Sequence, residues 1–278
     1  MGSEYDIRTG SKTFLVGEYS VLFGGGAVVL VTAPYFRLKI RSGKTNLVGV
    51  EEQSPAYRFY KTHDFNGLSI DFCDPHNKSG GFGASSAQFS LLYQLYLRLT
   101  RKEFDAKSFL AEYKQLSSKT KGVAPSGADC VAQYFNYSIY FNGADGSAEK
   151  INRNFPNLDF AIFSTGYKVA THLHLQELKA FNIEKFQKAV LGVRKSFADG
   201  NEEALVENVR NFSDLLAENN FVCDNSLGIV EKLLKTEGVR AAKGCGALGA
   251  DTVLVIFEKS KIPDESVLRE IVSGATAG

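Results

Sequence analysis

Alternating and continuous apolar runs predict strands along the first half of the chain. Thr13–Val16 and Ala27–Thr32 are rich in β-branched and aliphatic residues, and Tyr35–Arg41 alternates apolar with polar side chains. Leu68–Phe72 and Ser138–Phe141 are two further short runs of this kind. The first half is therefore expected to supply several β-strands.

Apolar residues at helical spacing predict helices in both halves. In the first half they run over Phe89–Leu99 and Lys107–Leu116, and the turn "KGVAPSGADC" leads into a third helix through Cys130–Tyr134. In the second half, Ile183–Phe197 and Glu203–Asn219 have the pattern of long amphipathic helices. A strand is expected there at Phe160–Ser164 and a helix at Leu227–Thr236. The stretch "AAKGCGALGADTVLVIF" predicts a glycine turn followed by a strand, and Glu265–Val272 predicts a closing helix.

This mixture of strands and helices predicts an α+β fold. The stretch "NGADGSAEK" has the polarity of a loop, and the change in character between the halves falls near "NRNFPNLD". We therefore expect two parts, residues 1–155 and residues 156–278.

Composition and charge exclude several classes of function. A formal net charge of +1 over 278 residues is too neutral for a nucleic-acid binder, so no nucleic-acid partner is expected. No apolar run reaches the ~18 residues of a membrane span, and Gly26–Ala33 is too short for one and follows a polar start, so neither a membrane partner nor a signal peptide is expected. The four cysteines are widely separated, without CxxC or metal-ligand spacing, which favours reduced thiols in a cytoplasmic protein; they are Cys73, Cys130, Cys223 and Cys245.

The stretch "SGGFGASSAQFSLLYQLYLRL", which begins at Ser79, predicts a glycine loop that leads into a helix. Such a helix start is a ready anion site, because its first N–H groups lack partners and glycine lets phosphate oxygens approach closely. Ser85 or Ser86 could add a hydroxyl toward a phosphate or Mg²⁺. The alternative is a tight turn and a capped helix without a ligand. The stretch matches neither a P-loop nor a dinucleotide-binding fingerprint.

Three glycine-marked stretches follow one another along the chain, "SKTFLVGEYSVLFGGGAVVL", "SGGFGASSAQ" and "KGCGALGADTVLVI", and "APSGADCVA" lies between the last two. Their order and spacing resemble the GHMP kinase superfamily over nearly the whole chain. The first is similar to the family's P-G-K…G-E-[HY]-x-V motif, with Ser11 where proline or glycine is common. The others resemble G-L-G-S-S-A, written here G-F-G-A-S-S-A, a loose G-A-G-G-G, and the P-S-G-[IVA]-D of mevalonate kinases and their near relatives.

The resemblance implies a two-part GHMP kinase fold. Its N-terminal half would be similar to ribosomal protein S5 domain 2, and its C-terminal half would be ferredoxin-like. ATP would sit in the cleft between them, with Mg²⁺ as a second cofactor.

Two catalytic residues follow from the matched motifs. Asp129 matches the catalytic aspartate, which can act as general base toward an acceptor hydroxyl. Lys12 matches a lysine that lies near that aspartate in relatives and could neutralise developing negative charge. The alternative role for the pair is to orient and polarise the acceptor rather than to deprotonate it early. The simpler alternatives are an Asp that caps a helix and a solvated lysine at a strand end.

The nucleotide and metal ligands implied by the resemblance lie in the second glycine stretch. Ser85 aligns with the family's Mg²⁺-contacting serine, whereas Ala84 replaces the first serine of the family pair. Mevalonate kinases also carry a glutamate that binds Mg²⁺, and Ser118 stands at its position here, which is a departure from the family pattern. The residues expected around the ATP phosphates are Gly81, Phe82, Gly83, Ala84, Ser85 and Ser86.

The expected acceptor site is drawn from several parts of the chain. Glu18 and Tyr19 should lie near the acceptor pocket, and a tyrosine where mevalonate kinases commonly have histidine is more similar to phosphomevalonate kinases. Within "GYKVATHLH", Lys168 and Thr171 are candidates for substrate contact. His172 and His174 there could bind metal only with a third ligand. The third glycine stretch contains Gly244, Gly246 and Gly249. In relatives this stretch stabilises the phosphate loop and adjoins the substrate.

The resemblance implies an ATP-dependent kinase that phosphorylates a small isoprenoid precursor in the mevalonate pathway. Mevalonate is the first choice of acceptor because of "PSGAD". Phosphomevalonate is the alternative, favoured by "GEY" and the missing glutamate; it would want extra cations, for which Lys78, Lys168 and Lys243 are available. Two further alternatives are a non-catalytic nucleotide-binding sensor on the same scaffold and the related diphosphomevalonate decarboxylase. A homodimer is a possible assembly.

Overall fold

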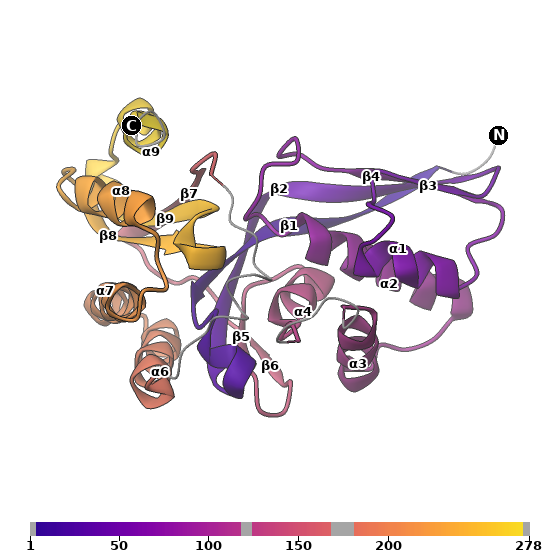
Figure 1. Cartoon of the computed structure of the whole chain (residues 1–278), viewed down its shortest axis with the longest axis horizontal. Coiled ribbons are helices and arrows are strands. Elements are labelled where there is room, and N and C mark those ends of the chain that lie inside the picture. The colour runs from indigo at the N-terminus through magenta and orange to yellow at the C-terminus, as the bar shows by residue number, and fades with distance from the viewer. Residues whose placement is uncertain (1–3, 118–123, 168–180, 275–278) are drawn as a thin grey trace.

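The computed structural model describes residues 4–117, 124–167 and 181–274. Within them the chain forms two sheets with helices packed on both (Figure 1). The larger sheet comes from the first half and has the order β3-β4-β2-β5-β6, with β1 paired to β2. Its six strands are β1 (Tyr5–Val16), β2 (Gly26–Ser42), β3 (Asn46–Val48), β4 (Leu68–Cys73), β5 (Ile139–Asn142) and β6 (Ala148–Lys150).

Strand β2 is the centre of this sheet. One of its edges pairs with β1 along nearly its whole length, and the other pairs with β5 near the start and with β4 near the end. The two strands expected at Ala27–Thr32 and Tyr35–Arg41 are therefore one strand. They looked separate because the register shifts there: Ser11 pairs with Thr32 and Gly10 with Tyr35, so the residues around Pro34 have no partner in β1.

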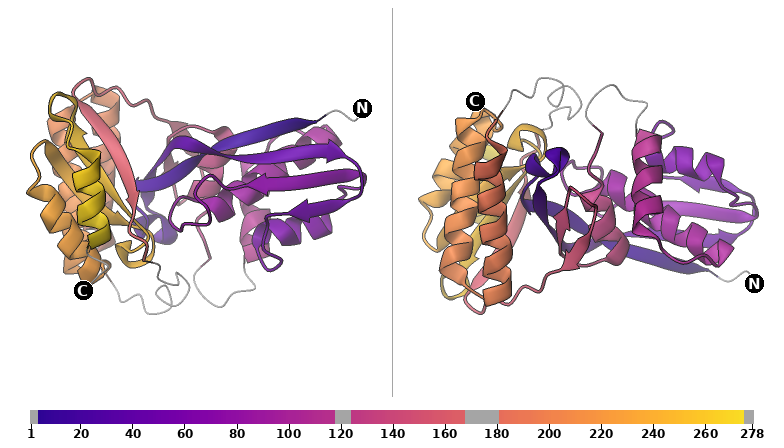
Figure 2. Two further views of the ribbon diagram at one scale, coloured as in Figure 1. Left: turned by 90° about the horizontal axis from the view of Figure 1, so that it is seen from above. Right: turned by 90° about the horizontal axis from the view of Figure 1, so that it is seen from below.

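The helices of the first half gather on one face of the large sheet (Figures 1 and 2). They are α1 (Pro55–Thr62), α2 (Ala84–Thr100), α3 (Ala106–Ser117) and α4 (Ala128–Phe135), and a short 3-10 helix, η1 (Ser20–Phe23), follows β1. Helix α1 is not evident from apolar spacing because it buries only Ala56 and Phe59. Its signal is at its start, where Ser54 accepts a hydrogen bond from the Tyr57 amide at 3.1 Å.

The second half contains a three-stranded antiparallel sheet in the described residues. Its strands, in the order β7-β9-β8, are β7 (Leu158–Ser164), β8 (Val239–Cys245) and β9 (Thr252–Glu258). Its helices are α6 (Ile183–Asp199), α7 (Glu202–Glu218), α8 (Asp224–Leu234) and α9 (Glu265–Gly274), with 3-10 turns η2 (Ala247–Gly249) and η3 (Lys259–Lys261). The glycine turn expected across "AAKGCG" is wrong in part, because β8 continues through Cys245.

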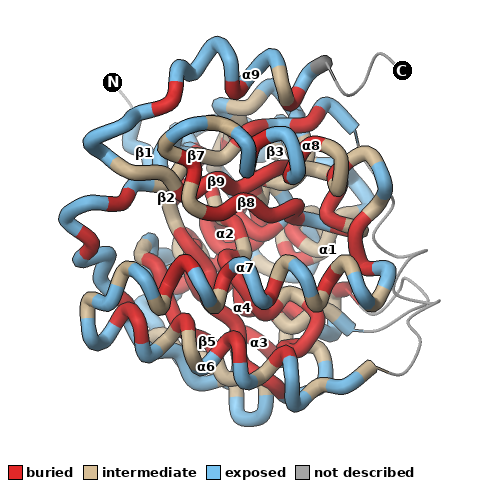
Figure 3. The backbone as a smooth tube through the Cα atoms, turned by 90° about the vertical axis from the view of Figure 1, so that its left-hand side faces the viewer, coloured by how far each residue is buried: buried red, intermediate tan, exposed pale blue. Residues whose placement is uncertain are grey.

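Strand β9 is buried on both faces, as its unbroken apolar run requires. Leu254 and Ile256 pack into the cluster formed with α6 and α7, whereas Val253 and Val255 pack against α8 and α9. Figure 3 shows β8 and β9 as almost wholly buried strands.

The two halves share a hydrophobic core. Leu15, Val28 and Leu30 from the large sheet pack in the same cluster as Phe186 and Val190 of α6. The boundary at residues 155 and 156 falls between β6 and β7 and cuts no strand or helix, and it stays a prediction. Sequence patterns could not show that the core crosses it, because periodicity says which face is buried but not what covers it.

All four cysteines are free thiols. Among the described helices, none is long and apolar enough to cross a bilayer.

Candidate active site

The second glycine stretch forms the entry to α2. Gly81 and Gly83 both have left-handed backbone angles, with φ +86° and +87°, and Gly83 is the N-cap without any side-chain cap. The first turn of α2 therefore has N–H groups that lack intrahelical acceptors, next to the positive end of the helix dipole. Ser85 is exposed in that turn, whereas Ser86 is buried and its hydroxyl donates to the Gly83 carbonyl at 3.1 Å. The predicted glycine loop and helix start are confirmed.

Lys12 on β1 lies directly against this stretch. Its backbone N–H donates to the Phe82 carbonyl at 2.9 Å. A Cβ atom placed on Gly83 would lie 2.5 Å from Lys12 Cγ, closer than real Cβ atoms approach another heavy atom. Only glycine thus lets the lysine stem pass here, and a positive charge is brought beside the start of α2.

Asp129 lies in the first turn of α4, which begins after Gly127 with no side-chain cap. It is partly buried, and its Oδ1 accepts from the Cys130 amide at 3.0 Å. One helical turn later, Gln133 donates to the Gly10 carbonyl at 2.9 Å and also borders Gly83. Because residues four apart share a helix face, Asp129 lies on the face of α4 that is turned toward β1.

The charges of Asp129 and Lys12 act on the same buried thiol. Burial raises the pKa of Cys130 well above its ordinary value, Asp129 raises it further, and Lys12 opposes both. No ion pair joins Lys12 to Asp129 among the residues that the structure describes. The two groups therefore occupy one neighbourhood without neutralising each other by direct contact.

Buried polar atoms without partners adjoin the two glycine stretches. Thr252 Oγ1 and Gln133 Oε1 are fully buried, and neither has a hydrogen-bond partner within the described ranges. Thr252 borders Gly81 and Gln133 borders Gly83. Since buried polar atoms are nearly always bonded, these two atoms fit a site whose ligand or ordered water bonds to them.

The third glycine stretch packs against the second. Gly246 has φ +90°, and the Asp251 amide donates to the Cys245 carbonyl at 3.1 Å. A Cβ on Gly81 would lie 2.6 Å from Thr252 Cγ2 and 2.8 Å from Asp251 Cβ. The loop that precedes α2 therefore packs against residues of the second half that are more than 160 positions away in the sequence.

His76 is a site residue that the motifs did not reveal. Its ring stacks on Phe82 with centroids 3.8 Å apart and planes 2° from parallel. Ser11 Oγ donates to the Pro34 carbonyl, so it accepts a hydrogen from His76 Nε2 at 2.6 Å. Burial lowers the pKa of His76, against a smaller opposing effect of Asp74. Its only sequence signal is its position shortly before the glycine stretch.

Stability should depend on pH through His76. Because the pKa of His76 is lowered in the folded chain, the unfolded chain takes up a proton first as the pH falls below the ordinary value of 6.5. The free energy of unfolding should therefore be highest above pH 6.5 and decrease below it. A His76→Phe variant keeps a ring on Phe82 and removes the titration. Urea unfolding on both sides of pH 6.5 should show a weaker decrease for the variant, and an identical decrease would contradict the role given to His76.

Glu18 and Tyr19 have partners other than an open acceptor pocket. The Glu18 carboxylate forms an ion pair with Lys243 on β8. The Tyr19 ring stacks on Phe221 at 4.4 Å, its hydroxyl accepts from the Leu248 amide at 3.3 Å, and burial raises its pKa. Both residues thus connect the end of β1 to the second half, and their contact with a substrate stays a prediction.

The three lysines expected to bind a phosphorylated acceptor differ in their exposure and their partners. Lys243 is fully buried and paired, so it is not an available cation. Lys78 is exposed, and its backbone N–H donates to Asp74. Lys168, Thr171, His172, His174 and Ser118 lie outside the described residues. The described part of the chain contains no cluster of three His, Cys, Asp or Glu that could hold a metal ion alone.

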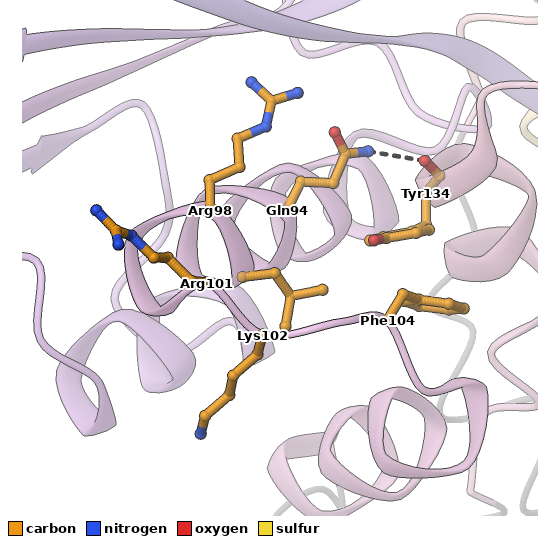
Figure 4. Close-up of a pocket in the computed structure, with 7 residues that line it drawn as sticks. Gln94, Arg98, Arg101, Lys102, Phe104 and Tyr134 are labelled. Carbon is orange, nitrogen blue, oxygen red and sulfur yellow. Dashed lines mark hydrogen bonds between the residues drawn. The ribbon is translucent and has the colours of Figure 1, made fainter.

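A surface pocket of about 490 Å³ lies at the opposite end of α2 from Gly83 (Figure 4). Its cations do not converge, since Arg98, Arg101 and Lys102 point in different directions in that view. Lys102 donates to the Tyr96 hydroxyl at 2.9 Å. The pocket therefore takes no part in the site at the glycine stretches. Its lining residues are Gln94, Leu97, Arg98, Arg101, Lys102, Phe104 and Tyr134.

Solved structures with the same fold are numerous, although the sequence matches no protein-family model and no curated protein. The phosphomevalonate kinase of Streptococcus pneumoniae matches with a TM-score of 0.75 at 15% identity, over 99% of this chain and 96% of that one. The mevalonate kinase of Methanococcus jannaschii matches at 0.73 and 17%, over 97% and 95%. The galactokinase of Lactococcus lactis, solved with galactose, matches at 0.79 and 12%, over 98% and 89%. The chain therefore has the two-part α+β fold of the GHMP kinases.

Proposed function

We propose that the chain is an ATP-dependent phosphotransferase that acts on a small acceptor of the mevalonate pathway. The observation that carries the proposal is the meeting of three features. The start of α2 has no side-chain cap, and the Lys12 side chain lies next to Gly83. Asp129 lies on the face of α4 that is turned toward β1. Phosphoryl transfer needs little more than this, because it depends on positioning and on neutralising charge.

The glycine stretch would hold the nucleotide. When bound, ATP supplies the phosphoryl group and Mg²⁺ offsets its negative charge. The residues fit, because the start of α2 has no side-chain cap, and buried polar atoms that lack a partner among the described residues border Gly81 and Gly83. Ser85 would provide a protein oxygen for the metal, which usually keeps phosphate and water oxygens as its other ligands. A solved complex of the Streptococcus phosphomevalonate kinase contains phosphomevalonate and AMPPNP.

Asp129 and Lys12 would act on the acceptor. The Asp129 carboxylate would orient the acceptor oxygen and take its proton, and the Lys12 ammonium would offset the charge that develops on the transferring group. Both side chains are held by regular elements, the start of α4 and the strand β1, which pairs with the central strand β2. The contact of Gly246 with Asp251 would keep the third glycine stretch behind the phosphate-binding loop.

Mevalonate is our first choice of acceptor, because "APSGADCVA" leads into α4 with Asp129 in its first turn. Phosphomevalonate is the second candidate. It is favoured by Tyr19 and by Ser118 at the usual glutamate position, whereas solved phosphomevalonate and mevalonate kinases match over similar shares of the chain. Lys243 does not favour it, since that lysine is paired with Glu18.

The acceptor is tested by ADP release measured in parallel with mevalonate, phosphomevalonate, diphosphomevalonate, homoserine and galactose. We expect ATP- and Mg²⁺-dependent release with mevalonate, and phosphate formation from diphosphomevalonate would instead indicate the decarboxylase. Release with homoserine or galactose alone would overturn the assignment to the mevalonate pathway. ATP binding without release for any acceptor would favour the nucleotide-binding sensor.

A further inference from the structure

A buried ion pair joins the end of β1 to β8. Lys243 has no exposed surface, and its Nζ donates to Glu18 Oε1, to the Gly244 carbonyl at 3.1 Å and to Cys245 Sγ at 3.5 Å. Burial alone would lower the pKa of Lys243, but Cys245 and Glu18 outweigh it and raise that pKa. The lysine is therefore charged, and its position is set from both halves of the chain.

This pair is poorly explained as a stabilising feature. Glu18 Oε2 is buried and has no hydrogen-bond partner in the described part of the chain. Removing two charges from water is costly, and an incompletely bonded pair recovers less of that cost than a well-packed apolar pair. On the lysine side, the Phe212 ring 5.6 Å from Nζ adds a cation–π contact, so the missing partner is that of the Glu18 carboxylate. A role in specifying geometry accounts for the pair better than a role in stability.

The geometry that the pair specifies is that of the third glycine stretch. Lys243 immediately precedes Gly244, and Cys245 Sγ reaches the Phe14 carbonyl of β1 at 3.6 Å. The second half also holds the chain beyond them, since the Cys223 amide donates to the Leu248 carbonyl and Ser226 Oγ to the Gly249 carbonyl, each at 2.9 Å. Leu248 lies in the left-handed region, with φ +51°. Tyr19, the neighbour of Glu18, accepts from the Leu248 amide. The end of β1 thus holds this stretch on both sides of Gly246.

The position of the third glycine stretch also affects the loop that precedes α2. Asp251 and Thr252, which follow the last glycine of the third stretch, fill the space over Gly81. We propose that Glu18 and Lys243 are positioning residues, whose buried ion pair holds the third glycine stretch against Gly81 and so keeps the loop before α2 in its anion-binding shape. The kinetic part of this inference rests on the proposed phosphotransferase function, whereas the structural part does not.

The test replaces both charges with apolar side chains of similar length, in Glu18→Leu with Lys243→Met. Thermal melting should show stability equal to or above that of the wild type, because no unpaired charge is left. Amide hydrogen exchange of residues 81–87, measured without nucleotide, should be about tenfold faster, because the loop has lost its backing. With acceptor present, kcat/KM for ATP should fall by about 100-fold, as misplaced binding groups cost that much.

The matched control is Arg240→Met, which removes a cation from the same strand. Arg240 pairs with Glu203 and Glu258 and donates nothing to the glycine stretches, so exchange and kinetics should stay at wild-type values. Glu18→Gln is a milder variant that keeps a hydrogen-bond acceptor for Lys243. Its exchange rate at residues 81–87 should lie between those of the wild type and the double variant. If the double variant does not fold, the exchange rate of Glu18→Gln decides whether the ion pair positions the loop.

Unchanged exchange at residues 81–87 in Glu18→Gln and in the folded double variant would overturn the inference, as would faster exchange spread over the whole chain. A wild-type chain that releases no ADP would refute the proposed function only. The exchange rates would still decide whether the ion pair positions the loop.

Discussion

Replacing Asp129 by Asn should reduce turnover by about 1,000-fold while leaving nucleotide affinity nearly unchanged. The amide keeps the size of the side chain and can still accept the bond from the Cys130 N–H, so the start of α4 should survive. It cannot take a proton from an acceptor hydroxyl or present a negative charge to it. ADP release and calorimetric titration with an ATP analogue measure the two effects separately.

Asp145→Asn is the matched control for that variant. Asp145 also accepts a local backbone hydrogen bond, from the Ser147 amide at 2.9 Å, but it lies in the exposed turn between β5 and β6. Its replacement should leave turnover at the wild-type level. Full turnover in Asp129→Asn would exclude this carboxylate as the catalytic base, and equal losses in both variants would point to a general effect on folding.

Replacing Gly83 by Ala should weaken nucleotide binding by at least about tenfold and lower the free energy of unfolding by about 1–3 kcal/mol. The left-handed backbone at Gly83 strains any L side chain. The added Cβ would also collide with Lys12 Cγ at 2.5 Å and crowd Gln133 Nε2 at 3.2 Å. The lysine would have to leave the start of α2, and the proposed anion site would lose both its shape and the charge of Lys12.

Gly67→Ala separates strain from crowding. Gly67 has nearly the same backbone angle, φ +75°, yet a Cβ there would meet nothing within 4 Å. Urea unfolding should show a loss of stability in both variants, whereas nucleotide titration should show weaker binding only for Gly83→Ala. Equal nucleotide affinity in the two variants would mean that Gly83 does not shape the binding loop.

Elements with strong local signals were predictable, and elements with weak ones were not. Helices α6 and α7 bury regular apolar stripes, so their spacing alone revealed them. Strand β6 is three exposed residues that pair with β5 at the sheet edge, so no apolar pattern distinguished it from a loop. Strand β2 looked like two strands in the sequence because a continuous buried run changes to an alternating one at the bulge near Pro34.

The residues of the candidate site also differ in how well the sequence alone identified them. The glycine stretch and Asp129 at a helix start could be read from motifs, because a turn and the helix that follows it are neighbours in sequence. His76 could not be identified, since its role comes from stacking on Phe82 and bonding to Ser11. Glu18 was expected at an acceptor pocket, and only its contact with Lys243 shows that it joins the halves.

The sequence by itself determined the α+β class, the glycine loop before α2 and the residue types that the proposed chemistry needs. These follow from spacing within a few residues, where the backbone geometry of neighbours decides the outcome. Only the tertiary structure decided that Lys12 lies against Gly83, that Asp251 and Thr252 cover Gly81, and that Lys243 neutralises Glu18 from 225 positions away. Periodicity indicates which face of an element is buried, but the partner that covers that face is decided by the packing of the whole chain.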